Sequence, residues 1–82
     1  MPPEPTDPAV LAIADQILTG EITPYRGAAE IWAALAEEPG EYPEHLKAFV
    51  GLASEWQDHP EQRDDLDAYI RDEARLLISR GA

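Results

Sequence analysis

Apolar residues recur at helical spacing in four stretches of the chain, and polar segments with glycine or proline separate these stretches. The stretch over residues 46–60 sets most of its apolar side chains along one helical face: Leu46, Phe49, Val50, Ala53 and Trp56. It holds the only phenylalanine and one of the two tryptophans, so we expect it to supply the largest share of the core. No stretch alternates as a strand does, and the predicted fold class is therefore all-α.

Residues that start and stop helices set the limits of the first two predicted helices. The first begins at a cap on Thr6 or Asp7 and runs to about residue 18, after which Gly20 ends it in a left-handed conformation. Thr23 caps the second helix, which begins at Pro24 and runs to about residue 37.

The third helix is predicted over about residues 43–57 and the fourth over about residues 60–79. Asp58 is expected to cap the fourth helix, with Glu61 in capping-box position. Gly27 and Gly51 lie inside helices, where glycine costs up to about 1 kcal/mol relative to alanine, so each indicates a closely packed neighbour. Four helices with short links predict a compact antiparallel four-helix bundle. We expect a single helical domain over residues 6–82, preceded by a disordered lead-in at residues 1–5.

The helical faces also predict which side chains are buried. The expected core consists of Val10, Ile13, Ile17, Trp32, Leu35, Leu46, Phe49, Val50, Leu66, Ile70 and Leu77. Tyr69 is expected to face inward with the last three. Ile31, Leu52 and Leu76 are left over beside the predicted stripes.

The net charge of the chain limits the classes of molecule that it is expected to bind. The chain carries 17 acidic and 6 basic residues, for a formal net charge of −11, and it has no cysteine. Such a surface repels nucleic acid and anionic lipid and favours a basic protein as partner, although acidity also serves solubility alone. Without cysteine, a basic leader or an apolar run long enough to span a bilayer, the chain is expected to be soluble and cytoplasmic.

No motif or residue constellation predicts catalysis. The chain lacks a glycine-rich phosphate loop and a nucleophile elbow, and its two serines have no paired base in view. His45 and His59 are the only side chains suited to acid–base work at neutral pH. A metal site of Glu55, Asp58 and His59 has poor spacing, because only Glu55 and His59 share a helical face. We therefore expect no enzyme, no metal and no cofactor.

The remaining signal is a run of six acidic residues around the junction of the third and fourth predicted helices, with Trp56 among them. The candidate binding residues are Glu55, Trp56, Asp58, Glu61, Asp64 and Asp65. Carboxylates can steer a basic partner and an aromatic ring can anchor it. Equally, Trp56 could belong to the core and the acids could form a solvated rim.

Two stretches resemble known proteins. Residues 18–32, LTGEITPYRGAAEIW, and residues 49–63, FVGLASEWQDHPEQR, resemble a group of short, acidic, all-helical bacterial proteins of uncharacterised function. The Gly-Glu-Ile entry to the second helix is also similar to that of the helical immunity proteins that neutralise nuclease toxins of the colicin D and E kind. This resemblance implies binding and inhibition of a basic toxin.

The predicted function is therefore an acidic interaction module that binds or inhibits a basic protein. The alternative is a homo-oligomeric accessory or structural protein, in which Ile31, Leu52 and Leu76 are buried against a second copy.

Overall fold

The computed structural model describes residues 8–36 and 44–81, which form four α-helices and one short 3₁₀-helix. The elements are α1 (Pro8–Thr19), α2 (Pro24–Ala36), α3 (Glu44–Asp58), η1 (Pro60–Gln62) and α4 (Arg63–Gly81). The predicted all-α, four-helix class is confirmed. The expected lead-in at residues 1–5 and the cap at Thr6 or Asp7 lie outside the described residues, as does the predicted break at Pro39 and Gly40.

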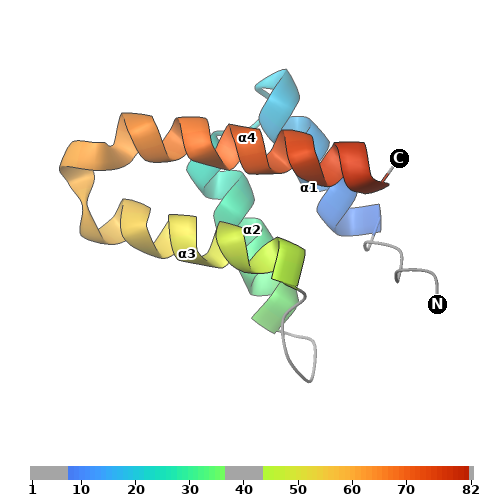
Figure 1. Cartoon of the computed structure of the whole chain (residues 1–82), viewed down its shortest axis with the longest axis horizontal. Coiled ribbons are helices and arrows are strands. Elements are labelled where there is room, and N and C mark those ends of the chain that lie inside the picture. The colour runs from blue at the N-terminus through green and yellow to red at the C-terminus, as the bar shows by residue number, and fades with distance from the viewer. Residues whose placement is uncertain (1–7, 37–43, 82) are drawn as a thin grey trace.

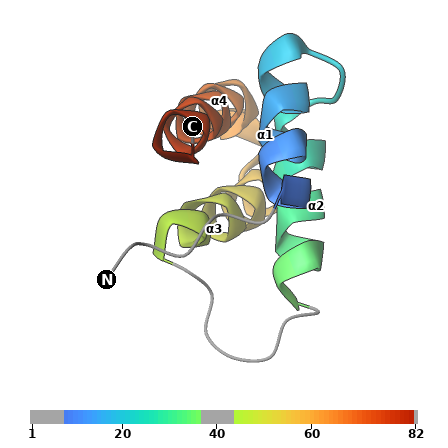
Figure 2. The ribbon, with the colours of Figure 1, turned by 90° about the vertical axis from the view of Figure 1, so that its right-hand side faces the viewer.

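Consecutive helices pair into two antiparallel hairpins, α1 with α2 and α3 with α4 (Figure 1). Viewed along α3 and α4, the α1–α2 hairpin crosses the other hairpin at a large angle (Figure 2). α1 packs on α4 and α2 packs on both α3 and α4, whereas α1 and α3 make no contact in the described part of the chain. Across residues 8–36 and 44–81, no helix combines the length and apolarity needed to cross a membrane.

The link between α1 and α2 folds as its sequence predicts. Gly20 has φ = +83°, a left-handed conformation that glycine adopts without a Cβ clash. Its N–H donates to the Ile17 carbonyl and the Glu21 N–H donates to the Gln16 carbonyl, which satisfies the last turn of α1. The Thr23 hydroxyl then accepts from the Arg26 N–H at 3.2 Å, so the predicted cap of α2 is confirmed.

Close packing between α1 and α2 occurs at Gly27. A Cβ at this position would lie 2.3 Å from Cγ1 of Ile17, which is itself only 1 % exposed. α2 therefore turns its Gly27 side toward the core, and Ile31, one turn further on, is fully buried. The assignment of Ile31 to a leftover surface was wrong. Trp32, on the predicted stripe, instead packs against the core while half-buried.

The core contains most of the residues that the helical pattern predicted. Thirteen apolar side chains in the described residues are buried: Val10, Ala14, Ile17, Ala28, Ile31, Leu35, Leu46, Phe49, Ala53, Leu66, Ile70, Ala74 and Leu77. Ile13 and Val50, expected among them, are half-buried and pack on the cluster, and so does Leu52. Tyr69 was wrongly placed inside, because it is 56 % exposed beside the α4 stripe of Leu66, Ile70, Ala74 and Leu77.

The junction between α3 and α4 differs from the prediction by one short element. α3 continues to Asp58, η1 separates it from α4, and His59 takes the cap position of η1 without a side-chain cap hydrogen bond. Asp58 therefore ends one helix and does not cap the next. The backbone closes the junction, since the His59 N–H donates to the Glu55 carbonyl at 2.8 Å and the His59 carbonyl accepts from the Gln62 N–H at 3.0 Å.

The two helical glycines of α2 and α3 make a matched test of the packing. Gly51 is exposed, and among the described residues no neighbouring group outside its own helix backbone lies within 4 Å of a Cβ placed there, so the expected close neighbour is not found. We expect Gly51→Ala to raise the free energy of unfolding by up to about 1 kcal/mol through helix propensity. Gly27→Ala should instead lower it by about 1–3 kcal/mol, because the added Cβ would overlap the buried Ile17 side chain.

Urea unfolding of both variants checks these signs. A stabilised Gly27→Ala variant would mean that α1 and α2 do not approach as closely as the structure shows.

Candidate functional site

The candidate binding residues lie at the α3–α4 junction, at one end of the molecule (Figure 1). We call residues 55–67 the acidic corner. It carries six acidic side chains and one basic side chain, Arg63. The five acids predicted to bind are all exposed: Glu55, Asp58, Glu61, Asp64 and Asp65. The structure therefore brings the predicted charges together at the end of one helical hairpin.

Trp56 is half-buried, and other residues of the chain cover its ring. The Tyr25 ring of α2 stacks on it with centroids 3.9 Å apart and planes 15° from parallel. The Arg63 guanidinium lies over the same ring system at 3.9 Å from the centroid. At these distances both groups would collide on one face, so they occupy opposite faces of the indole.

The polar atoms around Trp56 are also engaged. The indole N–H donates to Asp67 Oδ1 at 3.0 Å, and Arg63 Nε–H donates to the Trp56 carbonyl at 3.1 Å. Gln57 donates from its side-chain amide to the Tyr25 hydroxyl at 2.7 Å, which adds a second contact between α3 and α2. Together these bonds hold α2, α3 and α4 in one orientation.

These contacts bear on whether Trp56 can anchor a partner. With both ring faces and the N–H used inside the chain, the indole offers no free face to a partner and acts as a positioning residue for the acids around it. Tyr25 and Asp67 complete the contact, and neither was among the predicted site residues. Tyr25 lies 31 positions before Trp56, so helical spacing could not connect them. Asp67 is one of the six acids of the run, but nothing in its spacing from Trp56 marks it as the acceptor of the indole N–H.

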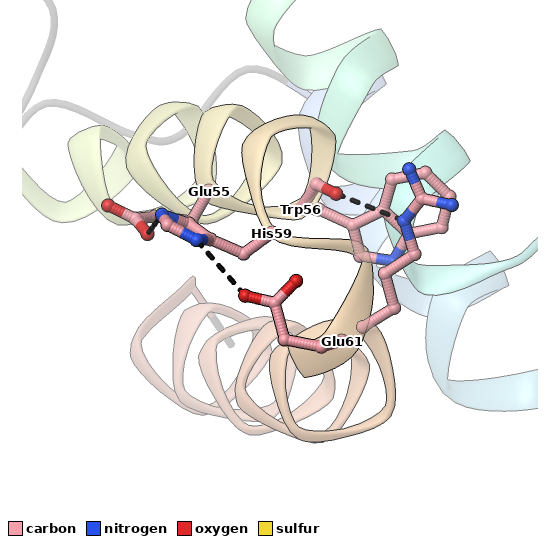
Figure 3. Close-up of polar contacts among 5 residues, drawn as sticks. Glu55, Trp56, His59 and Glu61 are labelled. Carbon is pink, nitrogen blue, oxygen red and sulfur yellow. Dashed lines mark hydrogen bonds and ion pairs between the residues drawn. The ribbon is translucent and has the colours of Figure 1, made fainter.

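His59 lies on another side of the corner from Trp56, between two carboxylates (Figure 3). Its Nε2 is 3.3 Å from Glu55 Oε2 and its Nδ1 is 3.4 Å from Glu61 Oε1. All three side chains are substantially exposed, so these contacts add little to stability. Within the part of the chain that the structure describes, no three histidine, cysteine, aspartate or glutamate side chains are placed to hold a metal ion. The side chain of His45 lies outside that part.

The acids of the corner differ in whether the nearby helix dipole stabilises or destabilises their charge. Asp64 and Asp65 lie in the first turn of α4, where the positive end of the helix dipole favours a carboxylate. Glu55 and Asp58 lie in the last turn of α3, which carries no basic residue, and the negative end of that dipole disfavours them. The side chain of Asp58 is exposed and makes no hydrogen bond or ion pair with the other described residues. Fold stability therefore explains Asp64 and Asp65 but not Asp58.

Comparison with protein-family models, with curated proteins and with solved structures returned no match.

The contact between Trp56 and Asp67 gives a direct test of the assigned positioning role. We expect Asp67→Ala to lower the free energy of unfolding by about 1–2 kcal/mol, because the half-buried indole N–H loses a charged acceptor. Asp65→Ala is the matched control, since it removes an exposed acid two residues away whose contribution is limited to the helix dipole, about 0.3–1 kcal/mol.

Chemical unfolding of the two variants measures this difference. Equal losses would show that the Trp56–Asp67 bond adds nothing beyond the charge itself.

Proposed function

We propose that the chain is an acidic protein–protein interaction module whose acidic corner binds, and thereby inhibits, a basic protein. The observation that carries the proposal is the group of five exposed carboxylates at the end of the α3–α4 hairpin. On this proposal the protein has no catalytic activity and needs no cofactor.

The single cation of the corner strengthens this argument. Arg63 is the only basic residue among residues 55–67, and its guanidinium is directed at Trp56 by a cation–π contact and a hydrogen bond to the Trp56 carbonyl. It is therefore placed to organise the junction, while the carboxylates on the outside stay uncompensated by it. Such a surface presents concentrated negative charge on a rigid support.

The chemistry of the corner defines its partner. A basic surface of matching charge ordinarily contacts phosphates, as in a nuclease-type toxin or another nucleic-acid-binding protein. Carboxylates placed in such a groove would exclude the nucleic acid, so binding and inhibition follow from the same contact. Exposed acids act mainly through the association rate, and this effect weakens as salt screens charges over a Debye length of about 8–10 Å. Nucleic acid and anionic membranes are not partners on this proposal.

A second candidate function is self-association into a homodimer through α4. Tyr69 and Leu76 are 56 % and 47 % exposed, and their separation of seven residues places them on one side of that helix. Asp72 and Arg75 form an ion pair between them along the chain, at 3.2 Å. The net charge of −11 opposes contact between two copies. Light scattering of the isolated chain at increasing concentration distinguishes this candidate from the first, which requires no dimer.

The experiment that tests the proposed function is capture of partners from the native cell, followed by mass spectrometry. One bait is the natural chain, and a second carries Asp58→Asn, Glu61→Gln, Asp64→Asn and Asp65→Asn. The matched control carries Asp15→Asn, Glu21→Gln, Glu30→Gln and Asp72→Asn, which remove the same charge from exposed positions outside the corner.

We expect a basic protein to be captured by the natural chain and by the control but lost by the corner variant and at high salt. Capture that both four-residue variants retain equally would show that the corner is not the binding surface.

Asp58 gives a sharper prediction, because its charge is unfavourable at the end of α3. Asp58→Asn should raise the free energy of unfolding by up to about 1 kcal/mol while weakening binding of the captured partner. Asp64→Asn should weaken binding too, but it should lower stability by about 0.3–1 kcal/mol.

Thermal unfolding and titration calorimetry on the same samples separate the two effects. An Asp58→Asn variant that binds the partner as tightly as the natural chain would remove Asp58 from the interface.

A further inference from the structure

We draw no further inference here: the strongest candidate, the exposed face of α4 around Tyr69 and Leu76, is the surface already considered for self-association, and nothing among the described residues shows what covers it.

Discussion

The Trp56 indole joins three helices at the acidic corner, and the geometry of the corner depends on it. The last turn of α3 and the first turns of α4 both carry carboxylates, whose mutual repulsion disfavours a tight junction. Stacking on Tyr25, the cation–π contact with Arg63 and the bond to Asp67 oppose that repulsion from the inner side. Side-chain contacts thus hold the inner side of the corner together while its outer side is charged. Its one arginine takes part in the inner contacts.

Much of the fold could be predicted because helix ends are encoded locally. Gly20 and Thr23 act within four residues of their own positions, so their roles follow from the sequence. Which side of a helix faces the core is decided by a partner helix that the sequence does not place. Gly27 and Gly51 both lie inside predicted helices, yet of these two only Gly27 lies against a buried side chain among the described residues. The exposure of Tyr69 has the same cause, because α4 packs along a narrower stripe than its apolar residues suggest.

The candidate site divides in the same way between local and long-range information. Proximity along the chain placed the five acids of the corner together, since all lie within eleven residues across a helix junction. The surroundings of Trp56 could not be predicted, because Tyr25 belongs to the other hairpin. In addition, the orientation of the indole determines whether its N–H donates to Asp67 or to water. His59 was considered as a metal ligand and an acid–base group. Its position between Glu55 and Glu61 depends on the turn that η1 introduces, an element absent from the helical pattern.

Because α1 packs on α4 and, among the described residues, does not contact α3, one side of α1 stays exposed during most of the synthesis of the chain. α1 leaves the ribosome first of the four helices, yet α4, on which it packs, is made last of the four. Until α4 emerges, the side of α1 that packs on α4 stays uncovered. A nascent chain halted within α4 would thus expose that surface to chaperones and proteases.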